Sequence, residues 1–271
     1  MNIFIKSILG LGILCLGMGC QEKVEGCMHP RAINFDPEAD VDEGCNYFEL
    51  TFSYQHYCSN SPDSIFSLGD TLLDKDNQAF VVTKFCLLGS ALHLLDTLQG
   101  IENISIELLN ITDFNANRTS VEDNFYLIHP ELDDYEVCGW VDLGTYNRIE
   151  TTLGLTGPAE SADPEKITET AHPLSSSAFF PMYDNILNKH RSFYAELLFL
   201  ADSSLIQLES FNTFPLQLEG MVTVVDDQNT TLPLFINYDA LFTDLSLMND
   251  PMNILINKIE QNLSQAIEYR P

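Results

Sequence analysis

The sequence predicts a mainly β fold: an antiparallel β-sandwich with a C-terminal amphipathic helix, preceded by a short disulfide-held N-terminal module. Three observations lead to this prediction. Many short segments alternate large apolar residues with small polar ones, as half-buried strands do. Loops rich in Asp, Asn, Gly, Ser and Pro separate these segments, which is typical of antiparallel sheets and not of alternating strand and helix units. One longer segment with helical spacing closes the chain.

The first strand is expected over residues 50–58, where Phe52, Tyr54 and His56 alternate with smaller polar side chains. Further segments of the same kind are expected to form strands over residues 79–88, 104–109, 124–128, 145–153, 192–200, 205–211, 216–225 and 232–238. The polar stretch 158–177 contains several Pro and Ser residues, and we expect it to be a long loop.

The predicted helix begins after Asp250, a good N-cap residue, with Pro251 at the first helical position. Its apolar residues recur at spacings of three and four: Met252, Leu255, Ile259, Leu263 and Ile267. Such a stripe covers one face of a helix. We expect this face to pack on the sandwich and not to bind a partner.

The first 19 residues have the pattern of a signal peptide. Lys6 precedes the apolar run 8–16, and small residues lead up to Cys20. The run is about half as long as a helix that spans a bilayer. Leu16 lies four residues before Cys20, which resembles the lipobox of bacterial lipoproteins, although Gly17 stands where a larger apolar residue is more usual.

We therefore expect a lipid on Cys20, a lipid-anchored linker over residues 20–25, and attachment to the cell envelope. The outer membrane is the expected location, on its periplasmic or its surface side. Cleavage without lipid attachment is the alternative.

Charge and motifs exclude some classes of function. The chain has a net charge of -28, with 12 Lys plus Arg against 40 Asp plus Glu, so nucleic acid would be repelled. The sequence contains no G-x-S-x-G, P-loop, H-E-x-x-H or C-x-x-C motif, and we expect no enzymatic activity. The expected partners are a membrane, through the lipid, and an envelope protein.

Residues 26–48 form a segment too short for a hydrophobic core, and we expect a bridge between Cys27 and Cys45 to hold it. Thiols oxidise outside the cytoplasm, and a bridge over a loop of this size contributes about 3 kcal/mol. The segment resembles a small cysteine repeat of secreted Bacteroidetes proteins. The mature chain also contains Cys58, Cys86 and Cys138, so an odd number of cysteines leaves one thiol free or on a metal.

Three carboxylates in this module are candidate calcium ligands, since Ca²⁺ prefers oxygen donors. They are Asp36, Asp40 and Asp42. The alternative is that they are solvated loop acids.

From residue 49 onward, several segments resemble, in order, those of the MbnP-like family, which takes its name from a copper-binding periplasmic protein of methanotrophs. They are Leu-Thr-Phe-Ser-Tyr-Gln-His at 50–56, the strand at 80–94, Tyr-Leu-Ile at 126–128, the Gly-Thr-Tyr segment from 144, His-Pro-Leu at 172–174 and Tyr-Asp-Ala-Leu-Phe at 238–242. The family is described as exported β-sandwich proteins, many of them lipoproteins. The resemblance implies one such domain over residues 49–271 and copper as its ion.

The candidate copper ligands are imidazole and sulfur groups, which suit this metal. His56 and Cys58 should share one face of a strand, while His172 lies in the long loop and Met182 offers a soft sulfur. The alternatives are that His56 caps a strand, Cys58 forms a disulfide, His172 is an exposed loop residue and Met182 packs in the core.

One departure from the family bears on this site. The family's Met-Tyr/Phe-Trp-x-Trp segment is replaced by Met182-Tyr183-Asp184-Asn185, and the sole tryptophan, Trp140, lies elsewhere. The tryptophan-derived copper ligand of the family therefore does not carry over. His190 lies between Lys189 and Arg191, and we expect it to be solvated.

Two hypotheses of function follow. The first is a cell-envelope lipoprotein that binds a metal ion, copper, for handling or storage. The second is a lipid-tethered β-sandwich without a metal site, which acts as a non-catalytic binding or structural module.

Overall fold

The computed structural model describes residues 23–28, 30, 32–45, 49–58, 64–96, 100–103, 105–106, 108–137, 139–140, 144–169, 171–178, 180, 182–225 and 228–271. The expected signal peptide, the lipid site Cys20 and the thiol of Cys138 lie outside these residues and stay predictions. The chain divides into two units after residue 48, and each is described by itself.

The N-terminal unit is held by the predicted disulfide. Cys27 and Cys45 are bonded, with their Cα atoms 4.7 Å apart. Strands β1 (Glu25–Gly26) and β2 (Val41–Asp42) pair in parallel beside this bridge. Among the described residues of this unit, the buried side chains are Cys27, Ala32 and Ala39, so the disulfide adds stability that these small groups do not supply.

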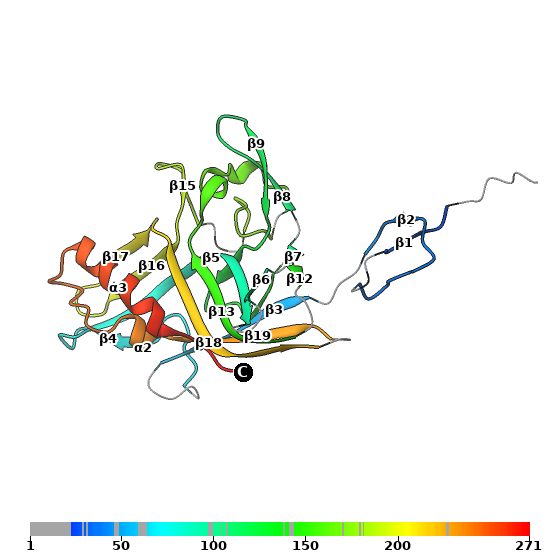
Figure 1. Ribbon diagram of the computed structural model, residues 1–271. Helices are drawn as coiled ribbons and strands as arrows, with labels where there is room; N and C mark the ends of the chain where they lie inside the picture. The colour runs from blue at the N-terminus through cyan, green and yellow to red at the C-terminus, as the bar shows by residue number, and fades with distance from the viewer. Residues whose placement is uncertain are drawn as a thin grey trace, which may run out of the picture. The chain divides into compact units, whose positions relative to one another are not determined.

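The second unit is built on a large antiparallel sheet (Figure 1). Its main path runs β17 (Leu205–Ser210), β16 (Phe193–Phe199), β5 (Ala79–Asp96), β13 (Gly144–Leu153) and β18 (Phe214–Val224). Three short strands also pair with β5: β4 (Thr71–Leu73), β6 (Gly100–Asn103) and β10 (Tyr126–Ile128). This large sheet confirms the predicted mainly β, antiparallel class.

A smaller sheet has the order β11 (Asp134–Val137), β3 (Leu50–Tyr57), β19 (Thr230–Asn237) and β20 (Ile267–Tyr269). Within it, β3 and β19 run parallel, with Leu50 beside Thr230. The sequence analysis did not predict this pair. A parallel pair needs a long connection between its strands, and here nearly the whole large sheet lies between them in the chain.

The main hydrophobic core lies between the two sheets. It contains Phe52 of β3 and Leu234 of β19 from one sheet, and Phe85 of β5 and Ile149 of β13 from the other. Helix α2 (Tyr238–Leu241) follows β19 and contributes the fully buried Tyr238.

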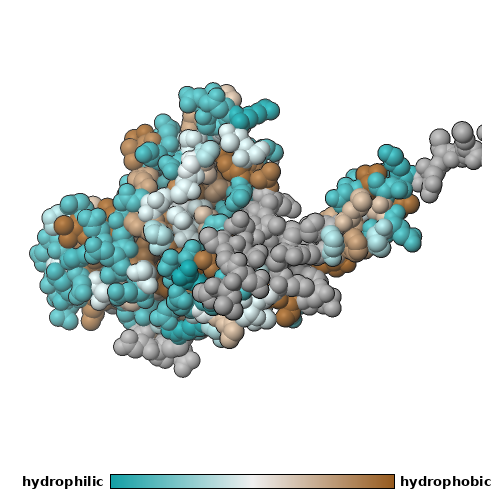
Figure 2. Space-filling view, viewed as in Figure 1, coloured by the Kyte–Doolittle hydropathy of each residue, from teal (hydrophilic) through white to brown (hydrophobic). Residues whose placement is uncertain are grey.

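The C-terminal helix α3 (Met252–Ala266) packs the middle of its predicted apolar stripe on this core, whereas Met252 is exposed and Ile267 already belongs to β20. Leu255, Ile259 and Leu263 are buried. The surface over α3 that Figure 2 shows is mostly hydrophilic. The predicted N-cap was wrong, because Pro251 holds that position and the Asp250 carboxylate accepts hydrogen bonds from the Ser246 amide and the Lys258 ammonium instead. No helix among the described residues is long and apolar enough to cross a bilayer.

A second core covers the other face of β5. Cys86 and Leu88 face it, whereas Phe85 and Leu87 face the main core, as alternation along a strand requires. Burial on both faces explains the continuous apolar run in this part of β5.

The second core is closed by the hairpin β8 (Leu108–Thr112) and β9 (Arg118–Glu122), by β10, and by the segment after β13. This segment contains η1 (Gly157–Ser161) and η2 (Pro164–Lys166). It was predicted as a loop, but Ala159, Ala162 and Leu174 are buried. Two further ribbons are β7 (Ser105–Ile106) with β12 (Gly139–Trp140), and β14 (Tyr183–Asp184) with β15 (Lys189–His190).

Candidate functional site

His56 lies in β3 and points into the main core, where it is 6 % exposed. Its Nδ1 is 3.0 Å from the hydroxyl of Tyr238. Burial lowers the pKa of His56 to about 4, and the charge of His129 acts in the same direction. The backbone of His129 offsets part of this lowering of the pKa. Nε2 has no hydrogen-bond partner. The ring is therefore uncharged at neutral pH and has one unpartnered nitrogen.

Cys58 is a free, half-buried thiol directly after β3. Burial raises its pKa to about 12, with further contributions from the charges of Asp239 and Asp70. Cys86 is also free, and its complete burial raises its pKa as well. Neither thiol is in a disulfide, contrary to the default expectation, and neither is ionised at neutral pH.

His172 was expected to be either a copper ligand or an exposed loop residue, and it is buried, at 4 % exposure. Its Nδ1 accepts a hydrogen bond of 3.1 Å from the Leu174 amide, which leaves the proton on Nε2. Nε2 then donates to the Asp123 carboxylate at 2.8 Å. Phe125 packs edge to face against the ring at 5.7 Å. Both nitrogens are thus engaged within the protein.

Met182 is 1 % exposed and packs in the second core. Its backbone carbonyl accepts a hydrogen bond from the Arg191 amide, so Met182 lies at the base of the β14–β15 hairpin. This environment matches the alternative in which its sulfur serves in packing.

His190 was expected to be solvated, and this prediction was wrong. The neighbouring Arg191 forms ion pairs with the carboxylates of Asp184 and Glu209. These carboxylates offset the charge of Arg191, so that charge does not prevent the burial of His190. The His190 ring lies 5.0 Å from that of Tyr183, and Nε2 donates to the Ala162 carbonyl at 3.3 Å. Nδ1 has no partner, and burial lowers the pKa to about 4.

The structure does not gather the candidate ligands at one point. His56 and Cys58 contact the main core, whereas His172 and Met182 contact the second core across β5. Among the described residues, a metal ion would find one group of three or more His, Cys, Asp or Glu side chains whose ligand atoms all lie within 4.8 Å of one another. This group is Cys27, Asp42 and Cys45. Because the two cysteines of this group form the disulfide, they offer no thiolates.

The calcium candidates do not converge either. Asp36, Asp40 and Asp42 accept hydrogen bonds from the backbone amides of Glu38, Val24 and Met28, respectively. Such bonds fold the loop, so these carboxylates have a structural role that neither the calcium hypothesis nor the alternative of solvated loop acids foresaw.

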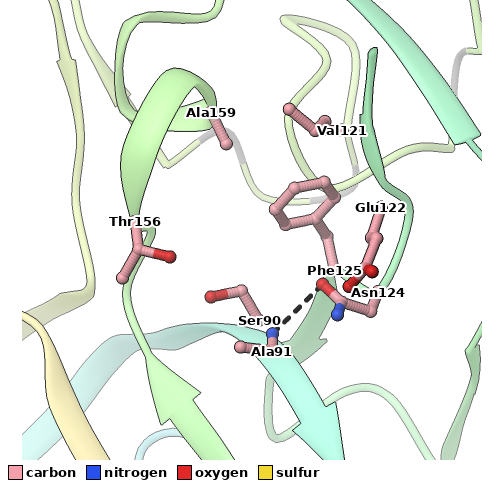
Figure 3. A pocket seen from close by; sticks show the side chains of 8 residues that line it. All are labelled: Ser90, Ala91, Val121, Glu122, Asn124, Phe125, Thr156 and Ala159. Carbon is pink, nitrogen blue, oxygen red and sulfur yellow. Dashed lines mark hydrogen bonds between the residues drawn. The ribbon is translucent and has the colours of Figure 1, made fainter. Parts of the chain in front are cut away.

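A cavity of about 250 Å³ opens where β5 passes beneath β9 and η1 (Figure 3). Its polar lining comes from Ser90, Glu122, Asn124 and Thr156, and Phe125 contributes an aromatic ring. The apolar pattern ended this strand at residue 88, whereas the family resemblance extended it to residue 94, and neither predicted the cavity. Gly89, inside what proved to be one long strand, was the available signal, because a lone glycine there indicates a bulge or a close backbone approach.

A second cavity of about 280 Å³ is lined by Lys84, Phe180, Arg191 and Tyr194. Its cations already have partners in the protein. Lys84 binds Glu196 at 3.0 Å, and Arg191 binds Glu209 at 2.6 Å. This cavity therefore offers no uncompensated positive charge to a ligand.

Comparisons with known proteins give one similarity. No protein-family model and no curated protein matches the chain. Among solved structures, MbnP from Methylosinus trichosporium is similar, with a TM-score of 0.44 and 11% identity over 77% of this chain and 86% of that chain. No ligand or residue role is transferred from a likeness of this level.

Proposed function

We propose that this chain is a non-enzymatic binding module of the cell envelope: a β domain, tethered by lipid at Cys20, that holds a ligand or a partner without a metal centre. The observation that carries this proposal is the engagement of His172. Its two nitrogens bind Leu174 and Asp123, so a metal ion could bind there only after one of these buried hydrogen bonds is broken.

The placement of the other candidates supports the same proposal. Cu(I) and Zn²⁺ need several ligand atoms within about 2 to 2.5 Å of one point. The thiol of Cys58 is protonated at neutral pH, and a thiolate is the form that binds metals. The remaining candidates lie against two different cores.

Copper handling is the second candidate function, and one specific observation favours it. His190 is an uncharged, buried imidazole whose Nδ1 has no partner. Neutral imidazole is a good ligand for copper, and His190 pairs across the β14–β15 hairpin with Tyr183, the residue after Met182. A copper site in this protein would use that nitrogen, which the sequence analysis did not select.

Metal loading separates the two functions. The purified mature protein is incubated with Cu(I), dialysed and analysed for metal by mass spectrometry. We expect retained copper well below one ion per chain, and no difference between the wild type and His190→Ala. Stoichiometric copper that is lost in His190→Ala or His172→Ala, with both variants folded, would establish copper handling in place of our proposal.

A further inference from the structure

We propose that the cavity at the bulge of β5 binds one ring of a neutral, polyhydroxylated ligand, a sugar. This inference rests on the proposed function, because it gives the binding module its ligand class.

Strand β5 has a bulge at the floor of the cavity. Its register against β13 shifts so that Glu150 faces His93 while Thr152 faces Ser90, which leaves one extra residue on β5. Ala91, within this shift, has a φ of 51°, a left-handed conformation that residues other than glycine rarely adopt. Bulges and strained residues of this kind occur often beside binding sites.

Asn124 holds the bulge in place. Its Oδ1 accepts the Ala91 amide at 3.1 Å, as the dashed line in Figure 3 marks. Because that oxygen must be the acceptor, the assignment of the carboxamide is fixed and its Nδ2 points away from Ala91. Asn124 is 4 % exposed, and Nδ2 has no hydrogen-bond partner among the described residues.

Nδ2 is not one of the enclosed polar atoms that lack a partner, so it is accessible and can donate a hydrogen bond to a group outside the protein. Nδ2 belongs to a cavity-lining residue, so an acceptor atom of a ligand would satisfy it.

The other walls supply complementary groups. Glu122 and Thr156 are exposed residues of the lining, and their side-chain oxygens have no bonds within the described protein. Figure 3 shows the Thr156 hydroxyl and the Phe125 ring facing the same space from two sides. The cavity thus combines a donor at Asn124, acceptors at Glu122 and Thr156, and an apolar surface.

These groups select the chemistry of the ligand. A hydroxyl group can accept from Asn124 and donate to Glu122, whereas an ammonium ion would place donors against the donor of Asn124. An anion is opposed by Glu122 and by the net charge of -28. An apolar ligand would leave Nδ2 unpaired. The volume, about 250 Å³, is below that of pockets for drug-sized molecules and suits a single ring.

The test is a titration of the purified mature protein with glucose, galactose and N-acetylglucosamine, followed by calorimetry and by ligand-observed NMR. We expect at least one of these sugars to bind saturably. Asn124→Asp keeps an acceptor for the Ala91 amide but loses the donor, and should weaken binding by about tenfold or more. Thr156→Val, which keeps the side-chain shape, should weaken it as well.

Asn115→Asp is the matched control, because it makes the same charge change at an exposed residue of the β8–β9 turn. It should bind like the wild type, and thermal unfolding shows whether each variant is folded. Failure of all three sugars to bind the wild type, unchanged binding by folded Asn124→Asp, or binding of methylammonium in place of sugar would each overturn the inference. Copper loading of the same preparation reports on the proposed function separately, so the two failures are distinguishable.

Discussion

At the level of single residues, the buried histidines differ in whether their ring nitrogens have partners. His172 is bonded on both sides, while His56 and His190 each leave one nitrogen unpaired. This difference separates a structural role from a potential ligand role, and it depends on contacts between segments far apart in the chain. Asp123, the partner of His172, is 49 positions away.

His172→Ala should destabilise the second unit by about 2 to 4 kcal/mol, because it leaves the buried carboxylate of Asp123 and the amide of Leu174 without partners. Urea unfolding followed by circular dichroism measures this change. Asp123→Asn keeps an acceptor for Nε2 and should cost less. A loss below about 0.5 kcal/mol in His172→Ala would show that the two hydrogen bonds do not anchor the loop.

The lowered pKa values of His56 and His190 predict a loss of stability in mild acid. Both fall from 6.5 to about 4 in the folded protein, so the unfolded chain binds more protons between these values. The stabilisation is complete above pH 6.5 and is lost as the pH falls towards 4, by at most about 3 kcal/mol for each residue.

Urea unfolding at pH 7, 5.5 and 4 measures this effect. His56→Gln and His190→Gln cannot take up the proton, so the free energy of unfolding of each variant should fall less steeply than that of the wild type. Equal slopes for the wild type and both variants would contradict the assignment of these two buried neutral rings.

Some site residues could be predicted from the sequence and others could not. The bridge between Cys27 and Cys45 could, because a segment too short for a hydrophobic core, with two cysteines, is expected to be held by a disulfide. The burial of His190 could not, because its charged neighbours suggest a solvated segment. Only the pairing of Arg191 with Asp184 and Glu209 removes that argument.

At the level of secondary structure, β5 organises the second unit. It pairs with β16 on one side and with β13 on the other, and it contributes to both cores. The apolar run predicted its first ten residues and ended before Gly89 and Ser90, although the resemblance to the family's strand continued to residue 94. These small residues do not interrupt the strand, since they precede a bulge whose partners, Asn124 and Thr151, come from other elements.

Gly89→Ala should be strongly destabilising. A Cβ at this position would lie 2.0 Å from the ring of Tyr126, which is held in place by its hydrogen bond to Thr151. We expect a loss of about 3 kcal/mol in urea unfolding. Gly144→Ala is the matched control, because its Cβ would meet nothing closer than 3.6 Å and should change stability by less than about 0.5 kcal/mol. Similar losses in the two variants would show that Tyr126 does not pack over Gly89.

At the level of the whole molecule, the chain is two units with separate sources of stability. The first depends on one disulfide, and the second on two hydrophobic cores whose residues all lie after residue 49. The fold class and the place of most strands could be predicted because they follow from local alternation. The parallel pairing of β3 with β19 could not, because it joins strands 180 residues apart.

Replacing Cys27 and Cys45 by serine should therefore unfold the first unit, at a local loss of about 3 kcal/mol, and leave the second unchanged. Hydrogen exchange followed by mass spectrometry should show lost protection in residues 23–45 alone. The thermal unfolding transition of the second unit should stay the same. Lower protection in β5 would contradict the independence of the two units.

The central claim, that the module works without a metal centre, depends on the rings of His172 and His190. Nitrogen-15 NMR of these two imidazoles in the purified protein, before and after one equivalent of Cu(I), tests it most directly. We expect each ring to carry its proton on Nε2, and we expect Cu(I) to leave the nitrogen shifts unchanged. A large shift of either His172 nitrogen, or of His190 Nδ1, would place a metal ion on that ring and contradict the claim.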